Sequence, residues 1–231
     1  MQKGLDMLIQ KYSLSDDAVI SEDGRCAVIN NGSYPILPWE CERRIIELRN
    51  IYKSGRIGEV CTYRIARTTE RGADLFDMLY REVGIMCFTL DSCVKSIFAV
   101  RSESCMNCIV ESESGCIATI ELAATLPAGE EDVDKHEMIC EIGVACDRVV
   151  DTQIPQHSIY LFSKDGAKWR DTDAELYGYA ECEVNKIRAA FALAKSEEYR
   201  EACVAKAKHI EAAVDAARKS LETLQNVKVG C

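Results

Sequence analysis

The sequence lacks any run of about 18 apolar residues, the length that a helix needs to cross a bilayer. Its first residues, MQKGLDMLIQKY, lack the apolar stretch and the small-residue cleavage site of a secretory signal peptide. It also lacks the glycine cluster G-x-G-x-x-G, with which a strand, a turn and a helix hold a dinucleotide. These absences predict a chain without a membrane span, without a signal peptide and without a cofactor bound by this chain alone.

Positive charge is also scarce. The 28 Lys and Arg residues are outnumbered by 38 Asp and Glu residues, which gives a net charge of −10. Proteins that bind nucleic acid gain affinity from clustered Lys and Arg, and an anionic membrane surface attracts the same residues. We therefore expect neither nucleic acid nor a membrane among the partners of this protein.

Cysteine is abundant, with 13 residues. Their number is odd, and many lie in apolar segments, where cysteine behaves as a small hydrophobic residue. The sequence C-x-x-C at Cys105 and Cys108 has no second pair to complete a zinc site, and it opens a predicted strand rather than a helix. His136, His157 and His209 lie far apart in unlike elements. We expect free thiols, no metal site and a reduced, cytoplasmic protein.

The stretch from 72 to 100 organises the predicted fold. Apolar residues at three- and four-residue steps predict one amphipathic helix, formed around Leu75, Met78, Leu79, Val83, Met86, Cys87 and Leu90. A buried strand follows, with Val94, Ile97, Phe98 and Val100. The helix also carries Asp77, Arg81 and Glu82. Whether these polar residues perform chemistry or face water decides most of the functional question.

The remaining elements predict the fold class. Further helices are expected at 2–12, 39–53, 174–194 and 197–225, and further strands at 25–30, 59–68, 105–113, 116–125, 137–142, 148–151, 157–163 and 227–229. Residues 13–24 and the acidic run 128–134 are typical of solvated loops. The fold class is therefore α+β, an open, largely antiparallel sheet of about six strands with helices packed on one face.

Three stretches carry a family resemblance. Residues 53–60, KSGRIGEV, look like a helix-end motif K-x-G-x-I-G-E, and residues 72–100 are similar to a segment G-G-x-hydrophobic-x-D-x-G-x-H-x-x-D with its following strand. Residues 211–229, EAAVDAARKSLETLQNVKV, look like a closing pattern with a central serine. Together they resemble the C-terminal domain of the Gfo/Idh/MocA family, which includes glucose–fructose oxidoreductase and inositol dehydrogenase.

The resemblance implies two domains, a truncated remnant of a nucleotide-binding Rossmann domain at 1–37 and an oxidoreductase C-terminal-like domain at 38–231. Members of the family bind NAD(P) in the Rossmann domain, which is mostly missing here. They hold substrate on one side of the C-terminal sheet, and often build oligomers with its exposed face. They oxidise or reduce sugars, cyclitols and related polyols by hydride transfer.

The family's catalytic residues are only partly present. The lysine of its E-K-P motif corresponds to Lys3, which is more simply interpreted as an exposed lysine near the chain end. The family's aspartate is kept at Asp77, its histidine falls on Arg81 and its second aspartate falls on Gly84. Arginine keeps its proton and cannot be the base that alcohol oxidation needs. Arg81 either grips a carboxylate or phosphate, or is solvated and paired with Asp77.

Three functions follow, with Lys3, Asp77 and Arg81 as the candidate catalytic residues. The first is a non-catalytic oligomerising or accessory subunit, which forms a homo-oligomer or heteromer through the exposed sheet face. The second is an oxidoreductase of a sugar or cyclitol, with NAD or NADP bound when another chain completes the site. The third is a binding module in which Arg81 anchors a small anionic ligand, such as an anionic sugar or acid.

Overall fold

The computed structural model describes residues 1–147, 173 and 175–230. Contacts between residues divide the chain into two compact units. Unit 1 comprises residues 1–41 and 149–203, and unit 2 comprises residues 42–148 and 204–231. Unit 1 thus takes in residues 149–203 from the second predicted domain, and the functional division at 37/38 stays a prediction.

Unit 1 combines short strands with helices. Its described elements are α1 (Gln2–Lys11), β1 (Ala18–Ile20), β2 (Cys26–Ile29), β3 (Gly32–Pro35), the 3-10 helix η1 (Pro38–Cys41) and α4 (Glu181–Lys195). The strands form an antiparallel sheet in the order β1-β2-β3. The sequence missed β1, which lies inside the expected loop 13–24, and β3. Strands of three and four residues are too short to show a periodic pattern.

Unit 2 contains a seven-stranded sheet. Its elements are α2 (Arg43–Lys53), β4 (Val60–Glu70), α3 (Leu75–Leu90), β5 (Val94–Arg101), β6 (Cys105–Ser112), β7 (Ile117–Leu126), β8 (Val133–Cys140), β9 (Val144–Cys146), β10 (Val227–Lys228) and residues 204–223 of α5 (Glu197–Thr223). The strand order is β10-β5-β6-β7-β4-β8-β9. Among the described pairs, β4 and β7 run parallel and the others antiparallel. This is the predicted α+β fold.

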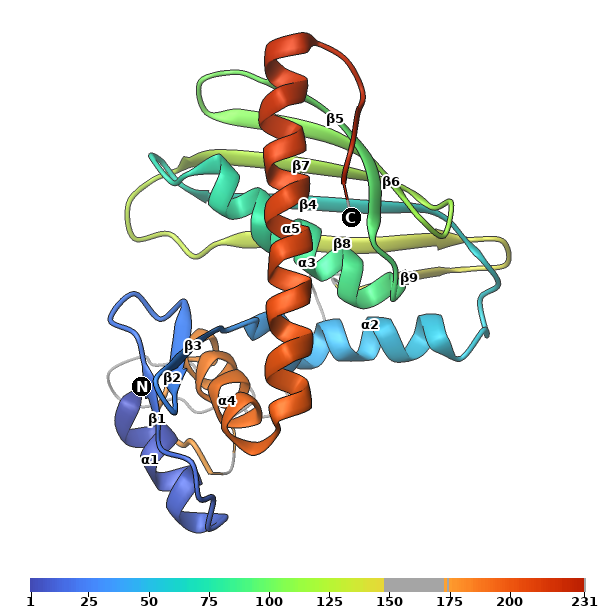
Figure 1. Ribbon diagram of the computed structural model, residues 1–231. Coiled ribbons are helices and arrows are strands. Elements are labelled where there is room, and N and C mark those ends of the chain that lie inside the picture. The colour runs from blue at the N-terminus through green and yellow to red at the C-terminus, as the bar shows by residue number, and fades with distance from the viewer. Residues whose placement is uncertain (148–172, 174, 231) are drawn as a thin grey trace, which may run out of the picture. The chain divides into compact units, whose positions relative to one another are not determined.

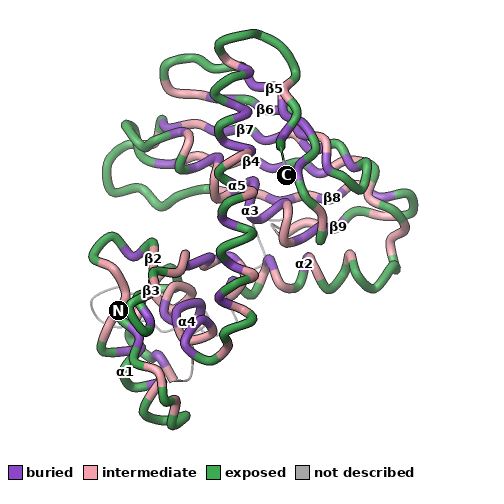
Figure 2. The backbone as a smooth tube through the Cα atoms, viewed as in Figure 1, coloured by how far each residue is buried: buried purple, intermediate pink, exposed green. Residues whose placement is uncertain are grey.

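Helices cover one face of this sheet. Helix α3 and the second half of α5 lie in front of the strands (Figure 1), and α2 packs against α3 and β9. Buried and more exposed residues alternate along β6 and β7 (Figure 2), and helix α3 packs against both strands. This alternation follows from the two-residue period of a strand. No helix in the described part of the chain is both long and apolar enough to cross a membrane.

The motif at 53–60 forms a tight turn between α2 and β4. Gly55 and Gly58 have φ angles of +65° and +73°, a region in which residues with a Cβ are strained. A Cβ on Gly58 would also lie 2.9 Å from Oε2 of Glu141. The positive φ therefore favours glycine at position 58, and an added Cβ would also press on the Glu141 side chain.

Helix α5 is held to β5 at two points. Nε2 of His209 accepts a hydrogen bond from the Val94 amide at 2.9 Å. Oγ of Ser220, the serine of the closing pattern, accepts from the Ala99 amide at 3.0 Å and donates to the Gln225 carbonyl at 2.6 Å. Ser220 is fully buried. It thus satisfies backbone groups at the sheet edge that a full-length neighbouring strand would otherwise satisfy.

The region after β7 differs from the prediction. The expected strand 137–142 is β8 and begins at Val133, inside the expected acidic loop 128–134. Strand β9 lies where the sequence indicated a turn at 143–147. The expected strands at 148–151 and 157–163 lie outside the described residues. The predicted helix from 174 begins at Glu181 as α4.

The uncovered face of the sheet has two chemical characters. Strand pairing aligns Phe98, Ile109, Thr119, Arg64 and Glu137 in one row across five strands. The β5–β6 end of this row is apolar, and Ile109 is 52% exposed. At the other end Arg64 and Glu137 form an ion pair at 3.6 Å. The face is therefore mixed rather than uniformly apolar.

Replacing Ser220 with alanine tests its role at the sheet edge. Ser220→Ala leaves the buried Ala99 amide without its acceptor, which costs about 1–3 kcal/mol. Urea unfolding should report a loss of stability in this range. Lys219→Ala, at the exposed neighbouring position, should change stability by less than about 0.5 kcal/mol. Equal effects of the two substitutions would contradict the assignment.

Candidate functional site

Charged residues occupy positions on the helix-covered side of the sheet that a core would normally fill with apolar residues. On β4, Arg67 follows Tyr63 and Ile65 at two-residue steps and pairs with Asp134 of β8. On α3, Glu82 stands four residues from both Met78 and Met86 and is fully buried. Strand β8 carries His136 on the same face, also fully buried.

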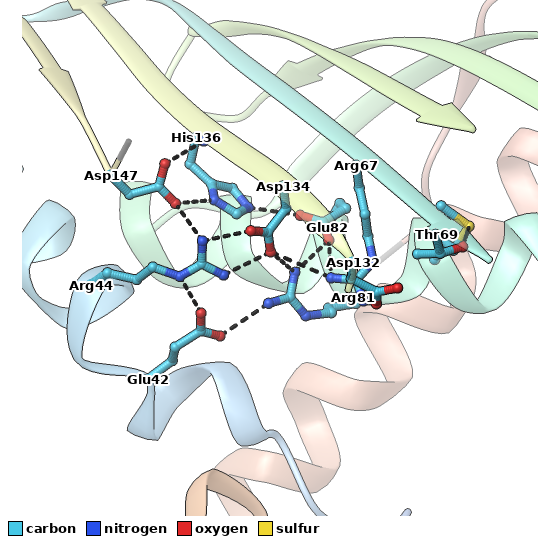
Figure 3. A network of polar contacts seen from close by, with 11 residues as sticks. Glu42, Arg44, Arg67, Thr69, Arg81, Glu82, Asp132, Asp134, His136 and Asp147 are labelled. Carbon is cyan, nitrogen blue, oxygen red and sulfur yellow. Dashed lines mark hydrogen bonds and ion pairs between the residues drawn. The ribbon is translucent and has the colours of Figure 1, made fainter. Parts of the chain in front are cut away.

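These residues belong to one network of ion pairs, which also includes residues of α2 and the chain after β9 (Figure 3). The network contains Glu42, Arg44, Arg67, Arg81, Glu82, Asp132, Asp134, His136 and Asp147. All of them lie in unit 2.

Arg81 is held among three carboxylates. Its Nη1 lies 2.5 Å from Oε1 of Glu82 and 3.2 Å from Oδ2 of Asp134, and its Nη2 lies 3.0 Å from Oε2 of Glu42. Burial lowers the pKa of Arg81, but the charges of Glu82, Glu42 and Asp134 outweigh it and raise the pKa overall. The side chain is 23% exposed. Arg81 is thus a bound cation within a network rather than a solvated residue.

Asp134 receives a second guanidinium in bidentate fashion. Nη1 and Nη2 of Arg44 bond to its two carboxylate oxygens at 2.6 and 2.7 Å. Nε of Arg44 bonds to Glu42. Burial raises the pKa of Asp134, but the hydrogen bond and charge of Arg44, with that of Arg81, hold it well below its usual value. Asp134 is therefore ionised, although the sequence placed it in a solvated loop.

His136 lies between two buried carboxylates. Its Nδ1 is 2.6 Å from Oδ2 of Asp147 and its Nε2 is 2.8 Å from Oε2 of Glu82. Burial lowers the pKa of His136, but the hydrogen bonds to Asp147 and Glu82 and their charges raise it to about 9. At neutral pH the imidazolium therefore donates to both carboxylates. In this state it has no lone pair with which to accept a proton.

The charge balance limits the chemistry of the network. Five carboxylates face three guanidiniums and one imidazolium, so the cluster is close to neutral and slightly negative. Glu82, Asp134 and His136 present ligand atoms that all lie within 4.8 Å of one another, an arrangement that could hold a metal ion. The sequence had assigned no metal ligand. Nε of Arg67 is the buried side-chain polar atom that lacks a partner among the described residues.

The predicted site residues fall in different units. Lys3 is exposed on α1 in unit 1, whereas Asp77 and Arg81 lie one turn apart on α3 in unit 2. Asp77 is exposed. The histidines weighed as metal ligands are not grouped, since His136 bonds within the network and His209 bonds to β5. His157 lies outside the described residues.

The sequence analysis named Glu82 and weighed His136 as a metal ligand, but it placed neither among the candidate site residues, and it did not consider Arg67. The available signal was a charged residue at an inward position of an apolar pattern: Glu82 within the stripe of α3, and Arg67 in the row of Tyr63 and Ile65. Buried charges are rare unless paired. A charged residue at an inward position therefore predicts an oppositely charged partner nearby, but the sequence does not identify that partner.

The described part of unit 1 does not fit a dinucleotide. Its strands β1, β2 and β3 are antiparallel. A dinucleotide site needs parallel strands joined through a helix, with a glycine-rich turn at the N-terminus of that helix. Neither feature is present in the described residues of this unit.

No model of a protein family and no curated protein matches the chain. Among solved structures it is similar to scyllo-inositol dehydrogenase from Lactobacillus casei with bound NAD(H) and scyllo-inositol (TM-score 0.59, 12% identity, 84% of this chain and 63% of that chain). It is also similar to myo-inositol 2-dehydrogenase from Lactobacillus plantarum (0.59, 12%, 84% and 64%) and myo-inositol dehydrogenase from Corynebacterium glutamicum (0.57, 13%, 84% and 64%).

These similarities establish the fold that the resemblance implied. The chain covers less than two thirds of the length of each of these dehydrogenases. Identities of 12–13% leave residue roles to be argued from this chain's own side chains.

The pairing of His136 with Asp147 and Glu82 predicts how stability depends on pH. The pKa of His136 rises from an ordinary value of 6.5 to about 9 on folding. Its contribution to the free energy of unfolding is therefore complete below pH 6.5 and is lost as the pH rises toward 9. Between pH 6.5 and 8 the free energy of unfolding should fall by about 1.5 kcal/mol in urea titrations. His136→Asn should start less stable and vary little over this range. If the stability of the wild-type chain stayed constant between pH 6.5 and 8, the assignment of His136 as an imidazolium would be contradicted.

Proposed function

We propose that this protein is a non-catalytic relative of the Gfo/Idh/MocA oxidoreductases that acts as an oligomerising or accessory subunit. One observation carries the proposal: at the position that the resemblance aligns with the family's histidine, Arg81 is bound among Glu42, Glu82 and Asp134. Oxidation of an alcohol by hydride transfer needs a group that takes the hydroxyl proton, and a guanidinium cannot do so.

The surroundings of Arg81 support the same proposal. His136 is the histidine of this network in the described part of the chain. It is fully buried and has a raised pKa. Glu82 has a lowered pKa because Arg81, His136 and Arg67 outweigh the effect of its burial. Its carboxylate is ionised but already bonded to Arg81 and His136. A general base must reach the proton that it removes. Glu82 and His136 are instead bonded to each other, and Glu82 is also bonded to Arg81.

The uncovered face of the sheet supplies a surface for a partner. Val100, Ile109 and Ile117 on β5, β6 and β7 are 44%, 52% and 40% exposed. Burying such residues favours association, and charged residues beside them, such as Arg64 and Glu137, help to set register. A second copy of this chain or a complete dehydrogenase of the same fold is the proposed partner.

The alternative of an oxidoreductase completed by another chain rests on Asp77, which stays exposed on α3, and on the NAD(H) bound in the L. casei structure. The alternative of an anion-binding module receives less support. Three guanidiniums are present, but more carboxylates than guanidiniums already surround them, so a further anion would meet net repulsion.

Association through the sheet face is tested with Ile109→Glu. A carboxylate at this position would have to be buried without a partner, so the oligomer should dissociate to a single chain in light-scattering measurements. Ile142→Glu is the matched control, since Ile142 is 75% exposed between β8 and β9, away from this face. A strictly monomeric wild-type chain would contradict the proposed assembly.

The lack of catalysis is tested by titrating the purified chain with NADH and NADPH. No saturable change in nicotinamide fluorescence is expected up to about 1 mM, the upper end of ordinary Michaelis constants. Saturable binding with a dissociation constant in the micromolar range would overturn the non-catalytic proposal and favour the oxidoreductase.

A further inference from the structure

Glu82, Asp134 and His136 have the donor types and surroundings of a metal centre. Nε2 of His136 points at Glu82, while its Nδ1 is bonded to Asp147. Histidines that ligate metals usually make this second hydrogen bond to a carboxylate, which fixes the orientation of the ring. Asp134 is supported in the same way by the bidentate contact of Arg44. His136 is therefore oriented by Asp147, and Asp134 is oriented by Arg44.

The space between the two acids already attracts positive charge. Nη1 of Arg81 contacts both Glu82 and Asp134, at 2.5 and 3.2 Å. Nη1 of Arg67 also lies near both, at 3.5 and 3.4 Å. Two guanidiniums from different elements thus converge on one pair of carboxylates. This convergence is separate from the contacts that orient His136, and it shows that the pair attracts positively charged groups.

Arg81 is a partly exposed guanidinium that contacts both acids. Glu82 and His136 are fully buried, and Asp134 retains 12% of its side-chain exposure. The Arg81 side chain is 23% exposed. A cation that binds between the two acids therefore competes directly with the Arg81 guanidinium, which contacts both of them.

We propose that Glu82, Asp134 and His136 form a binding site for a divalent transition-metal ion, and that the Arg81 guanidinium competes with the metal for it. In the arginine-bound state the guanidinium neutralises the two acids. In the metal-bound state one carboxylate oxygen of each acid and Nε2 of His136 coordinate the ion. The proton of Nε2 is released to solvent. Arg81 then moves toward solvent. Imidazole and carboxylate ligands suit Mn²⁺ and its neighbours in the first transition series.

The test uses Mn²⁺ as the probe. The chain has 13 cysteines, which would bind Zn²⁺ or Cu⁺ through thiolates elsewhere, whereas Mn²⁺ prefers oxygen and imidazole ligands. The loss of the electron paramagnetic resonance signal of free Mn²⁺ measures the bound fraction. This experiment needs neither a cofactor nor an oligomer, so its result is independent of the proposed function.

Arg81→Met should bind Mn²⁺ at least about tenfold more tightly than the wild-type chain, because the competing charge is gone. Arg81→Met combined with Glu82→Gln should lose this gain. Arg56→Met removes an exposed positive charge outside the network and should bind like the wild-type chain. Equal affinity of Arg81→Met and the wild-type chain, or binding that survives the loss of Glu82, would overturn the proposal.

A second variant and a second measurement guard against misfolding. Arg81→Gln keeps hydrogen-bonding groups at the site without the charge, and it should show the same direction of change. In nuclear magnetic resonance spectra of the wild-type chain, Mn²⁺ should broaden the ring signals of His136 before those of His209, which bonds to β5. Broadening of His209 first would place the metal elsewhere and overturn the proposal.

Discussion

The burial of His136 between Asp147 and Glu82 is the constraint around which unit 2 is arranged. Removing charges from water is costly, and it is tolerated when each charge finds a partner of opposite sign and its hydrogen bonds are satisfied. Two buried carboxylates on one imidazolium leave negative charge over, and arginines from α2, β4 and α3 supply the balance (Figure 3). The network thereby ties both helices to the covered face of the sheet.

The same balance decides what the site can do. Groups that neutralise one another inside a protein are poor proton acceptors, because any proton transfer would leave a buried charge unpaired. Arg81 stands where the related fold of the inositol dehydrogenases is expected, by resemblance, to place a histidine. Its guanidinium is used to satisfy carboxylates. The arrangement is consistent with a scaffold that binds cations or partners rather than one that moves protons.

Much of the fold could be predicted because apolar residues repeat with the period of each element. The stripe of α3, the β6–β7 hairpin and the long final helix were found in this way. Strand β8 was placed four residues late, since its inward residues include Asp134 and His136, which break the apolar alternation. Arg81 was predicted as a candidate, but the other members of the site were missed for the same reason. Its members look like surface residues until the pairing of β4 with β8 brings them beneath α3.

The sequence by itself determined the helices, most strands, the α+β class and the glycines that the turn after α2 requires. These properties depend on local sterics and on the spacing of apolar side chains, and both follow directly from the order of the residues. Only the tertiary structure decided that Arg81 is bound among carboxylates and that His136 is charged. Those states depend on the distances between residues far apart in the chain, because the energy of a buried charge is set by the neighbours that replace water.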